Sequence, residues 1–165
     1  MKLLNAMAIA AMAVVSMSVP ALARVDPGTT RLLQTLQDHG VTILYNPTEC
    51  NSGDFLGLYN TKKRMILCYN TPNARAHNIV RHEAFHALQH CGALRRGDRR
   101  GIVPLAINHA ERHEFVTSVL STRDINHIKS LYKRDHHQFE IEAFAAAEHY
   151  SADELASLVK SWCLK

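Results

Sequence analysis

The chain has 165 residues and a formal net charge of +4 at pH 7. Beyond its N-terminal end it has no apolar stretch long enough to span a bilayer, and no internal repeat or low-complexity linker. Part of the positive charge lies in residues 94–100 (LRRGDRR), which could attract an anionic surface but are more typical of a solvated loop. The composition therefore argues against a membrane-spanning protein and predicts no specific nucleic-acid partner.

Residues 1–23 have the features of a secretory signal. Lys2 provides a short positive region, residues 3–19 are mostly apolar, and Ala21-Leu22-Ala23 is a small-residue cleavage site. Removal of this segment gives a mature chain that begins at Arg24, and residues 24–165 have the usual size of one domain with one core. We therefore expect a secreted or periplasmic protein with no stable membrane anchor after signal cleavage.

The first part of the mature chain combines one helix with a group of strands. Leu32, Leu33 and Leu36 give residues 28–40 an amphipathic helical pattern that stops at Gly40. Three short β-rich runs follow, and a turn joins the last two. The runs are residues 41–46, 55–60 and 64–70, and the turn is residues 60–63.

The second part is predominantly helical. Residues 75–90 carry apolar side chains at helical spacing, with Gly92 just past the predicted end. A looser stretch follows, residues 115–121 are ambiguous between helix and strand, and residues 136–150 are strongly helical. Ser151 and Glu154 form the capping box of a last helix. The order predicts an α+β fold in which a small β-sheet packs on a central helix that precedes a mostly helical part.

The four cysteines all lie in the mature part of the chain. An even number of cysteines in an exported protein favours disulfides, although sequence alone cannot fix their connectivity. We expect Cys50–Cys68, because these residues are close along the chain. We also expect Cys91–Cys163, which would tie the central helix to the last helix.

Residues 82–86 read His-Glu-Ala-Phe-His within the predicted central helix. Residues four apart lie on one helix face, so His82 and His86 can bind one zinc ion, while Glu83 can reach a water molecule on the metal without ligating it. This arrangement suits metal-assisted hydrolysis, in which zinc activates the water and the carboxylate takes its proton. Residue frequencies give about 0.03 expected chance matches of the pattern. The alternative is a helix whose histidines are merely exposed or hydrogen-bonded.

Three other histidines are weaker candidates. His90 lies about 12 Å along the helix axis from His82, which is too far to share one metal ion, so we expect a helix-end cation or a group that supports the ligands. His109 and His113 also lie four apart but lack the glutamate, which is typical of a polar helix face.

A catalytic zinc ion needs a third protein ligand and an open fourth position. The candidates lie in residues 139–148 (FEIEAFAAAE) and are Glu140, Glu142 and Glu148. Residues two apart on a helix point in different directions, so only one of Glu140 and Glu142 is expected to face the metal.

The pattern His82-Glu83-x-x-His86 followed by Glu140-x-x-Ala143 resembles the zincin metallopeptidases, and among them the gluzincin-like branch that takes its third ligand from a later helix. The metzincin continuation of the motif is absent. The resemblance implies a zincin-like fold, zinc ligands His82, His86 and Glu140, and Glu83 as general base. It also implies that the edge of a strand holds an extended peptide. The chain departs from the branch at Phe144, where several families have an Asp or Asn that supports a ligand histidine, so the choice between Glu140 and Glu142 stays open.

The function implied by the resemblance is that of an exported zinc metallopeptidase, a metalloendopeptidase-like hydrolase with one Zn²⁺ per chain and a peptide or protein substrate. One alternative is a zinc amidase that acts on cell-wall peptide. Another is a catalytically inactive metal-binding module that uses the fold to bind a partner. A peptidase also needs a group that stabilises the oxyanion, and the sequence does not choose among Tyr132, His136, His137 and Tyr150.

Overall fold

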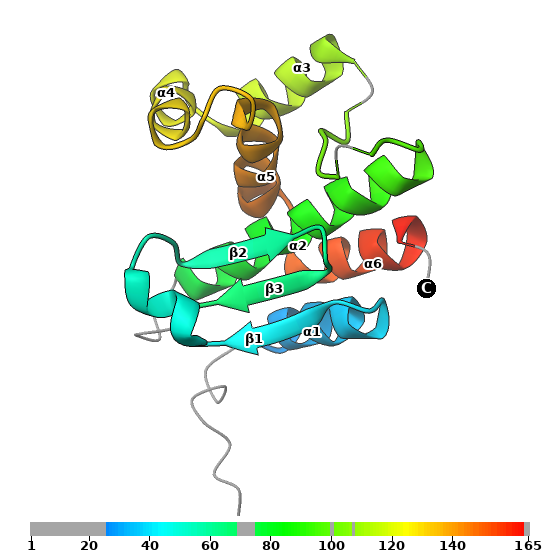
Figure 1. Ribbon diagram of the computed structural model, residues 1–165. Coiled ribbons are helices and arrows are strands. Elements are labelled where there is room, and N and C mark those ends of the chain that lie inside the picture. Colours follow the sequence, from blue (N-terminus) through cyan, green and yellow to red (C-terminus); the bar gives the residue numbers. More distant parts are fainter. Residues whose placement is uncertain (1–25, 69–74, 100, 107, 164–165) are drawn as a thin grey trace, which may run out of the picture.

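The computed structural model describes residues 26–68, 75–99, 101–106 and 108–163 (Figure 1). The predicted signal segment and Arg24 lie outside the described residues. Within those residues the protein has a three-stranded sheet and six α-helices, which confirms the predicted α+β class. None of the described helices is long and apolar enough to cross a membrane.

The elements follow the predicted order of a β-rich part, a central helix and a helical part. The strands are β1 (Thr42–Tyr45), β2 (Gly57–Asn60) and β3 (Arg64–Leu67), with a short 3₁₀ helix η2 (Thr48–Ser52) before β2. The helices are α1 (Pro27–Asp38), α2 (Arg75–Arg95), α3 (His109–Val119), α4 (Thr122–Leu131), α5 (His137–His149) and α6 (Ala152–Trp162).

The sheet has the strand order β1-β3-β2, so β2 lies at one edge. β1 is parallel to β3 and β2 is antiparallel to it. The predicted turn between β2 and β3 is present, and it is closed by a hydrogen bond from the Lys63 N–H to the Asn60 carbonyl oxygen (3.0 Å). In Figure 1, α1, α2 and α6 lie behind the sheet, and α3, α4 and α5 lie above it.

Two clusters of buried apolar side chains hold these elements together, and α5 contributes to both. The larger cluster joins the sheet to α1, α2 and α6, and it includes Ala143 and Ala146 of α5. The smaller one joins α3 and α4 to α5 through Ile141 and Ala145. Helix α5 is therefore held between the α3–α4 pair and the main core, with its inner side against α2 (Figure 1).

The predicted end of the central helix is wrong. α2 continues to Arg95, and Gly92 lies inside the helix, where an added Cβ would come within 2.6 Å of Leu105 Cδ2. Close packing therefore accounts for this glycine. The glycine that terminates the helix is Gly97, just beyond its last turn: it has a φ of +67°, and the Asp98 N–H donates to the Ala93 carbonyl oxygen (2.9 Å), as in a Schellman motif.

The other helix predictions hold with small changes. α1 ends before Gly40, whose φ is +82°, and the capping box of α6 is present. The ambiguous segment from residue 115 belongs to α3 up to Val119. α4 starts with a second capping box, formed by Ser121 and Asp124, which the sequence analysis did not identify.

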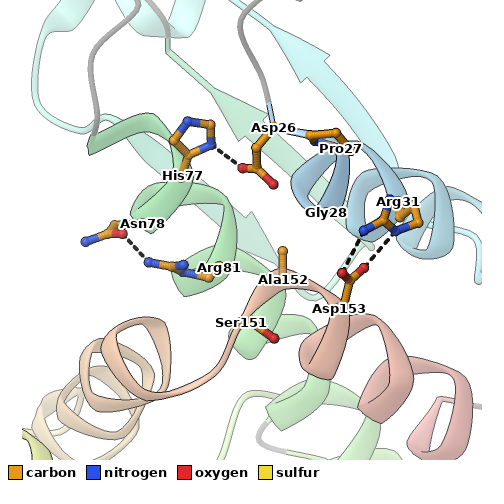
Figure 2. Close-up of a pocket in the computed structure, with 10 residues that line it drawn as sticks. All are labelled: Asp26, Pro27, Gly28, Arg31, His77, Asn78, Arg81, Ser151, Ala152 and Asp153. Carbon is orange, nitrogen blue, oxygen red and sulfur yellow. Dashed lines mark hydrogen bonds and ion pairs between the residues drawn. The ribbon is translucent and has the colours of Figure 1, made fainter.

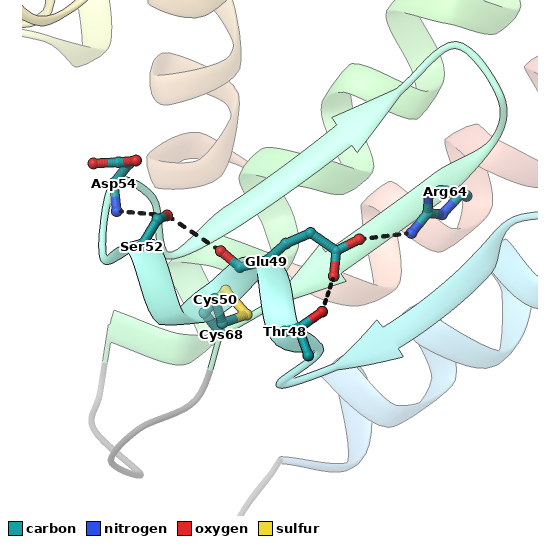
Figure 3. The surroundings of a disulfide bond; sticks show 7 residues. All are labelled: Thr48, Glu49, Cys50, Ser52, Asp54, Arg64 and Cys68. Atoms are coloured by element: carbon teal, nitrogen blue, oxygen red, sulfur yellow. Dashed lines mark hydrogen bonds and ion pairs between the residues drawn. A yellow bond between two sulfur atoms is a disulfide. The ribbon is translucent and has the colours of Figure 1, made fainter.

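Both predicted disulfides are present, and no described cysteine is free. Cys50–Cys68 attaches η2 to the end of β3, beside an ion pair between Glu49 and Arg64 (3.3 Å) (Figure 3). Cys91–Cys163 joins α2 to the residue that follows α6. Two disulfides in a chain of this size indicate an oxidising compartment.

Removal of the Cys91–Cys163 disulfide should destabilise the protein more than removal of the other one. The two bonds close segments of 72 and 18 residues. In the chain-entropy description these contribute about 4 and about 3 kcal/mol. Denaturant unfolding of the two double alanine variants, measured beside the parent protein, should show this order. Equal stabilities for the parent and the Cys91→Ala/Cys163→Ala variant would contradict it.

Candidate metal centre

The packing of α5 against α2 brings three potential ligands together. The Nε2 atoms of His82 and His86 lie 3.0 Å apart, and Glu140 Oε2 lies 3.3 Å from the first and 3.4 Å from the second. His82 and His86 come from successive turns of α2, and Glu140 comes from the first turn of α5. All three residues are buried, with exposed fractions of 8%, 5% and 7%. They form a group that could hold a metal ion.

The spacing of these donor atoms fits one small metal ion. Ligands of a tetrahedral zinc ion, each about 2.0–2.1 Å from the metal, lie about 3.3 Å from one another. The three observed separations are 3.0, 3.3 and 3.4 Å. Glu140 Oε2 is fully buried and makes no hydrogen bond. Because an unsatisfied buried carboxylate oxygen is costly, a cation at this position would remove an energetic penalty.

Glu140 is ionised at neutral pH. Burial raises the pKa of its carboxyl group, but the two adjacent imidazoles outweigh this effect and bring the pKa to about 2. A carboxylate between two imidazoles is a donor set that zinc and other first-row divalent ions accept. The donor set leaves the identity of the metal open.

Gln89 orients His86. Its side-chain oxygen lies 2.7 Å from His86 Nδ1, and its amide nitrogen donates to the Phe139 carbonyl oxygen (3.0 Å) and to Glu142 Oε2 (2.8 Å). Because these acceptors fix the amide, the Gln89 oxygen must accept a hydrogen bond from His86 Nδ1. The neutral form of His86 then carries its proton on Nδ1 and leaves Nε2 free to bind a metal.

His82 lacks comparable support. Its Nδ1 is buried and has no hydrogen-bond partner. The ring packs instead against Phe144, with 4.4 Å between the ring centroids. This apolar contact takes the place of a hydrogen-bond acceptor beside His82. The two histidines of the cluster are thus held in different ways.

Glu142 and Glu148 do not face the histidines. The two Glu142 oxygens accept hydrogen bonds from the backbone N–H groups of Leu105 (2.7 Å) and Ala106 (2.9 Å), and from Gln89. Glu142 therefore fixes the segment after α2 against α5. Glu148 accepts a hydrogen bond from the Asn78 side chain (2.8 Å) at the surface. Of the three glutamates considered, the structure brings only Glu140 to the histidines.

Glu83 is buried beside the cluster without belonging to it. The backbone of Tyr59 in β2 lies close enough to the carboxylate to lower its pKa. Burial outweighs this effect and the effects of His82 and His86, and it raises the pKa of Glu83 above its ordinary value. A raised pKa makes a carboxylate a better proton acceptor at neutral pH.

The three histidines that were weaker candidates for metal binding, His90, His109 and His113, lie outside the cluster. His90 is buried, and its Nδ1 lies 2.9 Å from the Tyr59 hydroxyl. Burial, together with the charge of Lys63, lowers the pKa of His90. His90 lies inside α2, which continues to Arg95, so it is not at the helix end. His109 and His113 are exposed on α3, as expected for a polar helix face.

Of the four groups considered for oxyanion stabilisation, Tyr132 is connected to the cluster through Phe144. The two rings lie 6.1 Å apart, and Phe144 packs on His82. Burial raises the pKa of the Tyr132 hydroxyl, and the charges of Glu140 and Glu83 raise it further. His137 contacts the backbone instead of the cluster: its Nε2 lies 2.8 Å from the Tyr132 carbonyl oxygen. His136 is exposed beside Phe139. Tyr150 packs beside Phe115.

A separate cavity of about 620 Å³ lies where the N-terminal ends of α1, α2 and α6 meet (Figure 2). It contains none of the predicted site residues. Four of its polar side chains are paired with each other: Arg31 forms an ion pair with Asp153 (2.6 Å), and His77 Nδ1 lies 2.8 Å from an Asp26 oxygen. These contacts connect α1 to α6 and to α2, which is a structural role.

Comparison with known proteins finds no family model that matches the chain, and no curated protein or solved structure matches it either. The interpretation of the site therefore rests on its residues and geometry.

The purified mature protein should bind about one zinc ion per chain through His82, His86 and Glu140. His82→Ala and His86→Ala should each abolish tight binding, because one of three protein ligands is lost. Loss of a residue that only supports a metal ligand typically lowers metal affinity about 10- to 100-fold. Glu140→Gln should lower zinc affinity by more than this, because Glu140 is expected to bind the metal directly. Elemental analysis and competition titration with a chelator would measure both effects.

Glu148→Gln is the matched control for Glu140→Gln, because both carboxylates lie on α5 and only Glu140 faces the histidines. Its zinc affinity should equal that of the parent. Full zinc binding by a folded His86→Ala variant would show that the metal lies elsewhere.

Proposed function

We propose that the protein is an exported, zinc-dependent metallopeptidase of the zincin type, with a gluzincin-like ligand set. The observation that carries the proposal is the position of Glu83. Its buried carboxylate lies directly beside a group of two histidines and a glutamate that could hold a metal ion. Metal-assisted hydrolysis needs a carboxylate that reaches the attacking water without ligating the metal.

Each of these residues has a separate role in the proposed hydrolysis. A zinc ion bound by His82, His86 and Glu140 would supply Lewis acidity, which acidifies the attacking water and polarises the carbonyl group of the scissile bond. Glu83 takes the proton from the attacking water and then delivers it to the leaving amine nitrogen. The raised pKa of Glu83 suits both steps, because the group must first accept a proton and then hold it until the carbon–nitrogen bond breaks.

The edge strand β2 supports a peptide as the substrate. The Cys68 N–H donates to the Leu56 carbonyl (2.9 Å), and the Lys63 N–H donates to the Asn60 carbonyl (3.0 Å). In an antiparallel pair these bonds alternate along the strand, so the backbone polar groups of Gly57 and Tyr59 point away from β3. They lie on the side of the strand where Glu83 is found. An extended peptide that paired with this edge would pass next to the proposed general base.

Glu83→Gln should abolish hydrolysis while zinc stays bound. Glutamine has the shape of glutamate but cannot take a proton from water, and loss of a general base typically lowers turnover about 10²- to 10⁴-fold. Zinc content and turnover of a generic peptide mixture would be measured for the parent and the variant. Parent-like cleavage by Glu83→Gln would rule out this catalytic centre. No cleavage by a zinc-loaded parent would favour the metal-binding module instead.

Tyr132→Phe should lower turnover because the variant loses the hydroxyl that would donate a hydrogen bond to the oxyanion. Loss of one such donor typically costs about 10²- to 10³-fold in kcat. The Michaelis constant should change much less, because the bond forms in the transition state. Tyr150→Phe is the control, since Tyr150 packs beside Phe115, and it should retain the parent kcat. Equal kcat values for the two variants would show that Tyr132 has no such role.

A further inference from the structure

We propose that Gly57 is a positioning residue for Glu83, because the absence of a side chain at this point of β2 leaves the space in which the Glu83 carboxylate lies. The inference rests on the proposed function, in which Glu83 is the general base. It concerns a strand residue that lies outside the His-Glu-x-x-His motif.

A side chain at Gly57 would collide with two side chains of α2 in their present positions. A Cβ added at Gly57 would lie 2.7 Å from Glu83 Oε1, 2.9 Å from Glu83 Cγ and 2.6 Å from Ile79 Cγ2. Carbon atoms in proteins do not approach one another this closely, so an alanine would force a neighbour to move. The backbone itself does not require glycine, since Gly57 lies in a strand and is not among the glycines with positive φ. The constraint therefore comes from the space that Glu83 and Ile79 occupy.

Strand β2 is held against α2 by a second residue, Tyr59. Its hydroxyl lies 2.9 Å from His90 Nδ1, about three turns further along α2 than Ile79. Its backbone lies close enough to Glu83 to affect the pKa of that carboxyl group. The Tyr59 side chain is buried in the main core, with an exposed fraction of 5%. Movement of β2 away from α2 would break this buried hydrogen bond and open the core. An alanine at position 57 would thus displace side chains of α2: the Ile79 Cγ2 methyl and the Glu83 carboxylate, which is at the end of a flexible side chain.

The test compares four zinc-loaded proteins: the parent, Gly57→Ala, Glu83→Gln and the double variant. Gly57→Ala should retain bound zinc and a cooperative unfolding transition, lower kcat by about 10-fold or more and change KM by less than about 3-fold. In the Glu83→Gln background the same substitution should have no further effect on kcat, because the group that it displaces is already inactive. Leu58→Ala controls for general damage to β2, since Leu58 is 39% exposed; it should keep the parent kcat.

Crystal structures of the parent and Gly57→Ala provide a readout that does not depend on activity. We expect the Glu83 carboxylate to be displaced from β2 in the variant, while His82, His86 and Glu140 keep their positions. An unmoved Glu83, a parent-like kcat, or an equal loss of kcat in the Glu83→Gln background would each overturn the inference. If the parent protein itself shows no hydrolysis, the proposed function fails, and the position of Glu83 in the variant still decides whether Gly57 positions it.

Discussion

The contact between α2 and α5 determines where the buried polar groups of this protein lie. It places an ionised carboxylate, Glu140, next to His82 and His86 in a region with little access to water. Such a charge is tolerated inside a protein only when it is paired or bound to a metal. The alanines of α5, including Ala143 and Ala146, allow the two helices to approach closely enough for this pairing. The group that could hold a metal ion is thus a consequence of helix packing.

The same contact organises the residues around the cluster. Gln89 connects His86 to Glu142, and Glu142 holds the backbone of residues 105–106. One polar network therefore joins a ligand histidine on α2, a carboxylate on α5 and the segment that follows α2. His82 has no equivalent network and is held by packing against Phe144. His86 therefore has its ring orientation fixed by a hydrogen bond, whereas that of His82 is fixed by packing.

The sequence predicted the features that depend on local spacing. The helical phase of His82 and His86, the capping box of α6 and both disulfide pairings follow from residues that are close in the chain or from the element order. Most features that depend on packing between distant segments could not be predicted from the residues themselves. The resemblance pointed to Glu140, but the choice between Glu140 and Glu142 depends on how α5 is rotated against α2. The role of Gly92 depends on Leu105, which packs against it, and a glycine inside a helix looks the same in sequence as one that ends it. Gln89 and Gly57 carry no recognisable signal, because each acts through a partner on another element.

The central claim is that His82, His86 and Glu140 bind one zinc ion beside Glu83. Anomalous diffraction at the zinc absorption edge, from crystals of the zinc-loaded mature protein, tests it most directly. The account predicts a single strong peak about 2.0–2.2 Å from the Nε2 atoms of the two histidines and from a Glu140 carboxylate oxygen. A well-ordered structure with no peak among these three side chains, or with its zinc bound elsewhere, would contradict the account.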